Sequence, residues 1–500
     1  MNRVPTPWAI ALLAALLVST GCVVGPNYKR PAAVTPPAFG EQPPPNFKEA
    51  EAAGWKQSQP GDAYFKGRWW ELYNDPALNA LEEQVAASNQ NVQQLEAQYR
   101  QAKALVSVSR AALYPVVTTS PSITTSGSGG SSANNITSNG TVVGGGSGIR
   151  STFNLPFNVS WEPDLWGNIR RGVSASVNSA QSVAAQVANA RLLFQAELAQ
   201  DYFGLHGNDG EAELLTNTEA SYEEYLTLTK NRFSVGIASD LDVAQAESQL
   251  YAVQSQLLDL GVERATFEHA IAILIGKAPA ELTIPVVSLK TEPPPVPAGV
   301  PSELLERRPD IASSERQVAA ANEQIGIAMA AYYPTLSLTA TAGLENSSFT
   351  KWFTWPSRFW SVGPALAETL FDAGKRRGVV AEQQAAYDAT VASYRQTVLT
   401  AMQQVEDNLA SLRILENEAA KVQETIGAAD RTLKISDAQY RAGTAAYLTV
   451  ITSQAALLSA QVTATSLLTR RLTASVTLIE ALGGGWNESE LPTRQDVASR

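Results

Sequence analysis

The sequence predicts a mostly α-helical protein with two internal repeats, each of which carries a β-hairpin of the kind found in membrane β-barrels. Three observations predict this class. The two halves of the 500-residue chain share motifs in the same order, long stretches contain no proline and little glycine, and short segments alternate between apolar and polar residues. Each repeat is therefore expected to run as a helix, two strands, a very long helix, a turn and a further long helix.

The repeat is marked by three pairs of matching segments. In chain order they are 111–115 (AALYP) with 330–334 (AAYYP), 170–173 with 376–379 (both RRGV), and 233–236 (FSVG) with 440–443 (YRAG). Three matches in one order are hard to obtain by chance. The predicted segments are 1–21 (signal peptide), 22–75 (lipidated N-terminal and equatorial part), 76–290 (repeat one), 291–301 (proline-rich linker), 302–483 (repeat two) and 484–500 (tail).

The amino terminus has the features of an export signal that ends in a lipid anchor. Arg3 precedes an apolar run at 8–18, and small residues lead to Cys22, the only cysteine. We expect acylation of Cys22, with this covalent lipid as the only attached group and no other cofactor. Val23, in place of an aspartate, favours the outer membrane. Ser19 departs from the usual lipobox, and an odd thiol or a discarded residue are the alternative interpretations.

Charge and composition argue against several classes of function. Residues 1–21 hold one charged residue, Arg3, so 36 of the 37 basic residues remain in the mature chain against 48 acidic ones, a net charge of −12. Such an acidic excess repels nucleic acid. The chain has two histidines, His206 and His269, and one cysteine that we expect to be acylated. It is therefore expected to hold neither a histidine-based catalytic triad nor a Cys/His metal site.

Two long helices are predicted, from Gly167 to about residue 230 and from Lys375 to about residue 439. The glycines of 206–210 (HGNDG) predict a kink or a short excursion in the first of them. Apolar residues spaced three and four apart predict a coiled-coil seam in the returning helices, although an ordinary bundle core would show the same stripe. The seam residues are Leu250, Val253, Leu257, Leu260, Arg264, Phe267, Ile271 and Leu274 in repeat one, and Leu448, Ile451, Ala455, Leu458, Val462, Thr465, Thr469, Leu472, Val476 and Ile479 in repeat two.

Four strands are predicted, at about 114–126, 152–163, 334–345 and 358–370. The alternating residues that we expect to face lipid are Phe153, Leu155, Phe157, Val159, Leu336 and Leu338. A soluble sandwich would show the same alternation, but the aromatic residues Trp352, Trp355, Phe359 and Trp360 are typical of a membrane interface. Four strands cannot close a barrel in lipid, because open edges leave backbone groups unpaired. More than one copy is therefore required.

Several motifs resemble those of the TolC-like outer-membrane efflux proteins, in particular the lipoprotein subgroup typified by OprM. They are 22–31 (CVVGPNYKRP), 69–76 (WWELYNDP), 304–311 (LLERRPDI), 333–334 (YP) and 440–444 (YRAGT), and they span nearly the whole mature chain. The resemblance implies a homotrimer with a 12-stranded barrel, a long α-helical barrel and an equatorial belt. It also implies two partners, a periplasmic adaptor and an inner-membrane pump, usually of the resistance-nodulation-division type.

Carried over onto this sequence, the resemblance places the adaptor contacts at the two helical turns and a gate directly after them. The expected adaptor contacts are Val235, Gly236, Ile237, Ser239, Arg441, Gly443 and Thr444. The expected gate residues are Asp240, Asp242, Tyr440, Tyr447, Leu448, Thr449 and Thr452. We hypothesise that Asp240 or Asp242 lies near Tyr440, while Tyr447 and Leu448 narrow the passage. The alternatives are that the glycines serve the turns alone and that the aspartates only stabilise the first turn of a helix.

The sequence departs from the family at the gate. Related channels carry charged residues at the positions of Ala445, Thr449 and Thr452, none of which is charged here. We therefore expect no strong cation-binding ring at the constriction.

The function that these expectations favour is an exit duct of a tripartite efflux pump for drugs or other small toxic molecules. The alternatives are the exit duct of a type I protein secretion system and a non-channel, structural coiled-coil lipoprotein. The lipid anchor and the sequence Arg307-Arg308-Pro309-Asp310 favour small-molecule efflux over protein secretion. The alternating strands disfavour a structural spacer, which has no use for them.

Overall fold

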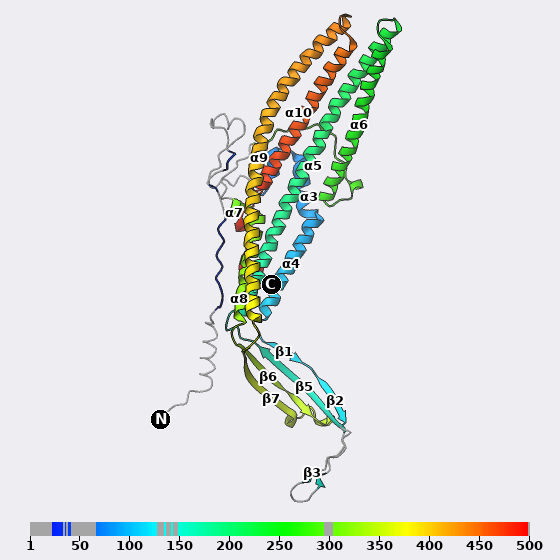
Figure 1. Ribbon diagram of the computed structural model, residues 1–500. Helices are drawn as coiled ribbons and strands as arrows, with labels where there is room; N and C mark the ends of the chain where they lie inside the picture. The colour runs from blue at the N-terminus through cyan, green and yellow to red at the C-terminus, as the bar shows by residue number, and fades with distance from the viewer. Residues whose placement is uncertain are drawn as a thin grey trace.

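The computed structural model describes residues 23–33, 36, 39–41, 67–127, 135–136, 142–143, 149–294 and 304–498. The predicted signal peptide, Cys22 and most of the proline-rich linker lie outside these residues. The protein is elongated, with long helices that form two tips at one end and a β-sheet at the other (Figure 1).

Each repeat contributes three main helices, and their lengths match in pairs. The pairs are α4 (Gln90–Ala111) and α8 (Pro309–Ala330) with 22 residues each, α5 (Asn168–Ser234) and α9 (Lys375–Arg441) with 67 each, and α6 (Asp240–Leu274) and α10 (Tyr447–Ala481) with 35 each. At ~1.5 Å per residue, α5 and α9 are each about 100 Å long. These pairs confirm the repeat and both long helices. No helix in the described part of the chain is both long and apolar enough to span a bilayer.

Along the chain, the shorter helical elements lie before, between or after the long helices, and two of them connect the two strands of the second β-hairpin. They are η1 (Trp69–Tyr73), α3 (Pro76–Ser88), η2 (Pro279–Glu281), α7 (Leu304–Arg307), η4 (Phe349–Lys351), η5 (Trp355–Ser357), η6 (Glu488–Glu490) and α11 (Arg494–Ala498).

The strands of both repeats form one antiparallel sheet. Its members are β1 (Val116–Thr119), β2 (Ser122–Gly127), β5 (Ile149–Trp161), β6 (Thr335–Asn346) and β7 (Arg358–Ala367), while β3 (Asn135–Ile136) and β4 (Val142–Val143) form a separate pair. The order is β1-β5-β6-β7, and β2 continues along β5 beyond β1. The four predicted strands are confirmed, with the first divided at residues 120–121. The outer strands of this sheet are β1 with β2 on one side and β7 on the other.

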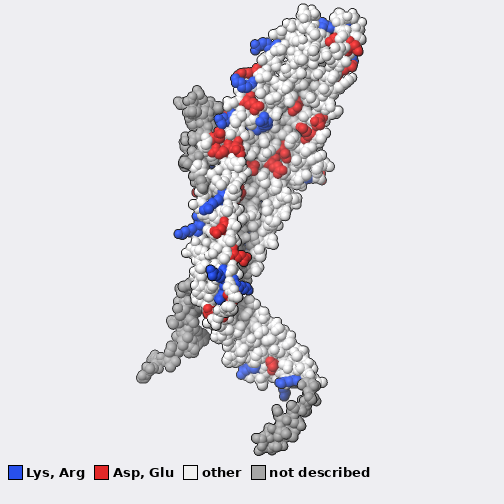
Figure 2. All heavy atoms as spheres, in the orientation of Figure 1, with Lys and Arg blue, Asp and Glu red and all other residues white. Residues whose placement is uncertain are grey.

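The strand register separates an apolar face of the sheet from a polar one. Val159 lies opposite Ala340, which lies opposite Val362 on β7. On the other face, Asn158 lies opposite Thr341, whose hydroxyl donates a hydrogen bond to the Asn158 side chain at 2.9 Å. The pairing and the alternation place all six residues predicted to face lipid on the apolar face. In the view of Figure 2 the sheet carries few charged side chains, which gather instead on the helices.

The predicted aromatic cluster at the end of the second hairpin is divided between environments. Trp352 is buried, its ring lies 5.6 Å from that of Phe153, and its indole N–H donates to the carbonyl of Leu344 at 3.2 Å. Phe359 and Trp360 are neighbours on β7 and so point to opposite faces. All four predicted residues lie at this end of the hairpin, between the end of β6 and the start of β7, and their role at a membrane interface stays a prediction.

The short excursion predicted at 206–210 is wrong, because α5 is helical throughout, and the predicted kink stays untested. The glycines permit close packing instead. A Cβ at Gly204 would come within 2.8 Å of the Phe267 ring on α6, and a Cβ at Gly207 would overlap the hydroxyl of Thr469 on α10.

A buried polar network beside these glycines fixes the chain that follows η2. The His206 Nδ1 atom lies 2.8 Å from the carbonyl oxygen of Val287, and Asp209 accepts hydrogen bonds from Arg264 at 2.8 Å and from the Val287 N–H at 3.2 Å. Asp209 is almost fully buried, so its charge needs these partners. The network has a structural role between α5, α6 and the connection to repeat two.

The main hydrophobic core lies at mid-length, where Trp69 and Tyr73 of η1 pack with Leu78, Phe203 and Val476. A second core lies nearer the tips. The predicted seam is buried at most positions in repeat one. In repeat two it is buried at Ile451, Leu472, Val476 and Ile479, whereas Leu448 and Ala455 are exposed. Near the tip, α10 buries Tyr447 and Val450 instead, because the second core lies on that side of the helix.

The first described residues are held where the helices meet the sheet. Arg171 is buried at the start of α5 and donates hydrogen bonds to the carbonyls of Val24 (2.6 Å) and Pro26 (3.1 Å). It also pairs with Glu323 of α8 at 2.7 Å. Val23 lies against Gly167, the residue before α5. The chain that follows Cys22 therefore begins at the boundary between the sheet and the helical body.

Candidate gate and docking site at the helical tips

Two turns of identical geometry form the tips. Gly236 and Gly443 have left-handed backbone angles, with φ of 78° and 76°. In each turn the N–H after the glycine bonds back to a carbonyl five residues earlier, from Ile237 to Arg232 (2.9 Å) and from Thr444 to Gln439 (2.9 Å). This is the Schellman arrangement, in which glycine avoids the strain that a side chain would bring. The structure thus confirms the turn role of both glycines.

The two tips present different surfaces. The tip of repeat one exposes apolar side chains, with Val235 and Ile237 69% and 73% exposed. The tip of repeat two exposes Arg441, Gly443 and Thr444. All seven residues predicted to contact an adaptor are exposed, as a docking surface requires, and the contact itself stays a prediction.

Both tyrosines predicted for the gate are buried within the subunit. Tyr440 and Tyr447 are 6% and 3% exposed, and their ring centroids lie 5.2 Å apart. Burial raises the pKa of Tyr447 above its ordinary value, so its phenol is neutral. Its ring centroid also lies 6.5 Å from that of Tyr225 on α5, so Tyr447 packs between the helical hairpin α5–α6 and the helical hairpin α9–α10. This burial corrects the expectation that Tyr447 narrows the passage.

Arg232, near the end of α5, connects the two tips and was not predicted. Its guanidinium donates hydrogen bonds to the carbonyls of Tyr440 (2.9 Å) and Arg441 (3.0 Å), the last two residues of α9. The same group lies 4.4 Å from the centre of the Tyr440 ring. A cation at a helix C-terminus and over an aromatic face is stabilising in both respects. A basic residue in the last turn of α5 is a visible signal, but its cross-tip partner is not.

A second connection between the hairpins lies one turn away. The Tyr225 hydroxyl donates to a carboxylate oxygen of Asp437 at 2.7 Å, and Arg441 donates to the same carboxylate at 2.9 Å. Burial, with a further contribution from the Asp437 hydrogen bond, raises the pKa of Tyr225 to about 12. Tyr225 therefore remains a hydrogen-bond donor at neutral pH. This donor holds α5 against α9.

Asp242 stabilises its own helix. It forms a capping box with Ser239, in which the backbone N–H and the hydroxyl of Ser239 donate to the Asp242 carboxylate at 2.9 and 2.8 Å. Asp240 lies in the same first turn. Tyr440 has other neighbours, since its hydroxyl lies 3.5 Å from that of Thr229. For Asp242, the alternative helix-stabilising role is the one that the structure shows.

The other three predicted gate residues lie on the free face of α10. Leu448, Thr449 and Thr452 are exposed in its first two turns. Their hydroxyl and apolar groups carry no charge, and the Thr452 hydroxyl donates to the Thr449 carbonyl at 3.0 Å. This face is available to line a passage, and that role stays a prediction.

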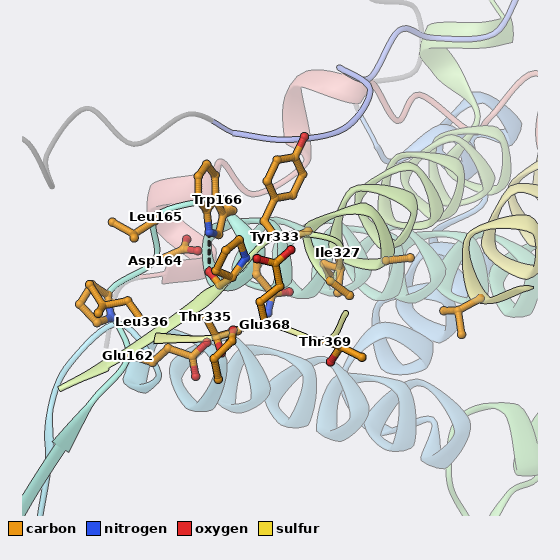
Figure 3. Close-up of a pocket in the computed structure, with 18 residues that line it drawn as sticks. Glu162, Asp164, Leu165, Trp166, Ile327, Tyr333, Thr335, Leu336, Glu368 and Thr369 are labelled. Carbon is orange, nitrogen blue, oxygen red and sulfur yellow. Dashed lines mark hydrogen bonds between the residues drawn. The ribbon is translucent and has the colours of Figure 1, made fainter. Parts of the chain in front are cut away.

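A cavity of about 520 Å³ lies at the opposite end, where helices and sheet meet. Figure 3 shows Trp166 and Tyr333 together on one side of it and Glu162 on another. The two rings stack with their centroids 4.8 Å apart, and the Trp166 indole donates to the carbonyl of Pro334 at 2.7 Å. These contacts fix the start of α5 to the start of β6. Within the described ranges, no group of three or more His, Cys, Asp and Glu side chains could hold a metal ion.

A match to a known protein family accounts for the combination of helical tips, long helices and sheet. The model of the family described as outer membrane efflux protein matches residues 81–277 and 300–484, one segment in each repeat. The chain belongs to the outer membrane efflux protein family. This family is one of efflux ducts of the outer membrane and not of enzymes.

Relatives that are named as efflux or export proteins of the outer membrane align with this efflux protein over nearly its whole length. It is 28% identical over 499 residues to the probable efflux pump outer membrane protein TtgC of Pseudomonas putida, with 98% of each chain covered. It is 30% identical over 474 residues to the pyoverdine export outer membrane protein OpmQ of Pseudomonas aeruginosa, which covers 93% of this chain and 96% of the relative. The solved structure of the outer-membrane channel OprN is 27% identical and superposes with a TM-score of 0.83, covering 93% of this chain and 100% of that one. The predicted family and its efflux function are confirmed.

Proposed function

We propose that three copies of this efflux protein form the exit duct of a tripartite pump. Their sheets would join into a 12-stranded barrel in the outer membrane, and their long helices would form a tube in the periplasm. The proposed cargo is a range of small toxic molecules, including drugs. Relatives support this choice of cargo, because one is named as a toluene efflux protein and another as an antibiotic efflux protein.

The observation that carries the proposal is the sheet, which has an apolar face and two open edges. Exposed apolar side chains such as Trp360 and Val362 are 77% and 71% accessible in one copy. Lipid would cover this face, whereas open strand edges in lipid cost several kcal/mol for each unpaired backbone group. Joining copies edge to edge removes that cost, and the polar face that carries Asn158 and Thr341 then lines a water-filled interior.

The position of the amino terminus supports a lipid anchor on Cys22. Val23 lies against Gly167 beside the sheet, so an acyl group on the preceding residue would lie at the level of the membrane surface. The anchor and the sheet would then enter the same membrane from one end of the molecule.

The tips support an adaptor at the other end, about 100 Å along α5 and α9. Val235 and Ile237 provide apolar contacts, and the contacts of Arg232 and Tyr225 hold the two hairpins of one subunit together. Opening of the passage would require these hairpins to move apart. The proposed adaptor joins the tips to an inner-membrane pump of the resistance-nodulation-division type.

Deletion of the gene tests the cargo and partner parts of the proposal. The deletion strain is expected to become more sensitive to several compounds in a panel of antibiotics, dyes, solvents and metals, and the intact gene should restore resistance. Cysteines or photoreactive residues at Ile237 and Thr444 are expected to crosslink to an adaptor in cells, whereas the same groups at the exposed position Lys421 should not. Unchanged sensitivity across the panel would contradict small-molecule efflux.

A further inference from the structure

We propose that β7 of one copy pairs antiparallel with β2 of the next copy in a single register, with Ala365 opposite Ser122 and Pro364 opposite Ile123. This inference rests on the proposed assembly of several copies and adds the exact alignment of the interface. The internal repeat supplies it, since one chain already contains the equivalent junction between its two repeats.

The two repeats correspond position by position. α4 and α8 are 219 positions apart at both ends, and the strands that follow them, β1 and β6, begin at Val116 and Thr335 with the same offset. α5 and α9 are 207 positions apart at both ends, which gives the offset for the strands that precede them, β5 and β7. The smaller second offset reflects the longer connection in the first hairpin.

The hairpins test these offsets independently. In repeat one, Val116 lies opposite Ser160, and in repeat two Thr335 lies opposite Ala367. Adding 219 to the first residue and 207 to the second converts one pair into the other. The correspondence therefore holds at the level of single residues within the sheet.

The junction between the repeats is the pairing of β5 with β6. There Asn158 lies opposite Thr341 and Phe157 opposite Ala342. Adding 207 to the β5 residue gives its equivalent on β7, and subtracting 219 from the β6 residue gives its equivalent on β2. The two pairs then become Ala365 with Ser122 and Pro364 with Ile123. Because β7 forms one edge of the sheet and β1 with β2 forms the other, this second junction can form only between copies.

The faces of the strands agree with this register. Ile123 lies opposite Phe153 on the apolar face, and Pro364 lies opposite Leu338 on the same face. A slip of one residue would set an apolar position against a polar one. Slips of two residues keep the faces but break the correspondence with β5 and β6. Pro364 lies on β7 and Pro121 lies between β1 and β2, so both are at the outer edges of the sheet, where proline is tolerated and discourages unintended pairing.

Disulfide crosslinking of the full-length protein in outer membranes tests the register. Side chains directly opposite each other have Cβ atoms about 4.5–5.5 Å apart, whereas diagonal neighbours are about 7–8 Å apart. A disulfide needs about 3.5–4.5 Å. The double variant Ser122→Cys/Ala365→Cys replaces two small residues and is expected, on mild oxidation, to convert the monomer band into a ladder of crosslinked copies on a denaturing gel.

Three controls make the result specific. The slipped pairs Ser122→Cys/Gly363→Cys and Thr124→Cys/Ala365→Cys should leave mostly monomer. The pair Asn158→Cys/Thr341→Cys should form a disulfide within one chain without a ladder. The protein with only Cys22 shows any background.

The outcomes separate the register from the assembly. A ladder from a slipped pair in place of the predicted pair overturns the register and leaves the assembly standing. A trimer by native mass spectrometry that no pair crosslinks also overturns the register. A monomer by native mass spectrometry, without any ladder, overturns the assembly in "Proposed function" together with the register.

Discussion

At the scale of single residues, the contacts that join the tips are ones that the sequence does not reveal. Asp242 is a conspicuous carboxylate after a turn, yet it caps α6. Arg232 is an ordinary basic residue in the last turn of α5, yet it holds the end of α9. The difference arises because a capping box is local and carries a sequence pattern, whereas a contact across 208 positions carries none.

Arg232→Ala is expected to favour the open tip. Hydrogen bonds from a charged group contribute about 1.5–3 kcal/mol where they are shielded, and Arg232 is only partly buried, so we expect ~1–3 kcal/mol. A shift of this size changes the ratio of open to closed states by about 5- to 150-fold. Single-channel recordings should therefore show longer openings, while Arg431→Ala, at an exposed position of α9, should not. Unchanged closed times for Arg232→Ala would show that the contact does not hold the gate.

Trivalent cations are expected to block the channel only weakly. Thr449 and Thr452 are exposed on α10 and uncharged, so they provide no carboxylate ring at the tip. Cation titration in single-channel recordings from the periplasmic side measures this directly. Thr449→Asp should increase the apparent affinity for the cation, and potent block of the unmodified protein would contradict the absence of a ring.

Glu82 is a second residue that no sequence pattern marks. It is fully buried beside Leu78 and Val85 on α3, and both carboxyl oxygens lack a hydrogen-bond partner. Burial raises the pKa of this carboxyl well above its ordinary range. The folded state therefore binds the proton more tightly than the unfolded state. This tighter proton binding contributes fully to the free energy of unfolding below the ordinary pKa of about 4.3. The contribution is lost as the pH rises towards the raised pKa of Glu82.

Glu82→Gln is expected to raise the melting temperature at about pH 8 and to change it little at about pH 4, because the amide stays neutral across this range. Thermal unfolding in detergent as a function of pH measures the effect. The neighbouring exposed carboxylate provides the control, since Glu83→Gln should shift the melting temperature little at either pH. A Glu82→Gln protein that is less stable than the original at the higher pH would contradict the burial of a neutral carboxyl.

At the scale of elements, the sequence predicted what periodicity and repetition encode. The strands around Phe157 and Leu338 alternate over their whole length, so their position and apolar face were both predicted. The path of α5 was predicted less well. Glycine is associated both with breaks and with close packing, and only the neighbouring Thr469 and Phe267 show that packing applies at Gly207 and Gly204. Near the tip, the predicted seam of α10 is buried at Ile451 but exposed at Leu448, because α10 there buries Tyr447 and Val450 in the second core.

Gly207→Ala tests the packing role of that glycine. The added Cβ would overlap Thr469, and overpacking of this kind costs about 1–3 kcal/mol. Gly261→Ala is the matched control, because a Cβ there meets open space. That substitution should stabilise the helix by about 0.5–1 kcal/mol. Unfolding in detergent compares the two, and adding Thr469→Ala should restore part of the loss. Equal stability of both single variants would show that α5 and α10 are not closely packed at this point.

At the scale of the whole molecule, a single chain has the parts of a duct without enclosing a passage. Its sheet has an apolar face but two outer strands, and its tips and sheet lie at opposite ends of the long helices (Figure 1). The repeat was predictable from the sequence because matched motifs survive in order. The number of copies was not, since four main strands and open edges require only more than one.

The most direct measurement of the central claim combines native mass spectrometry of the detergent-purified protein with conductance in a planar bilayer. We expect a single assembly of three copies that conducts ions, with a conductance that Arg232→Ala increases. A stable single copy that passes no ions would contradict the claim that several sheets join to form the duct.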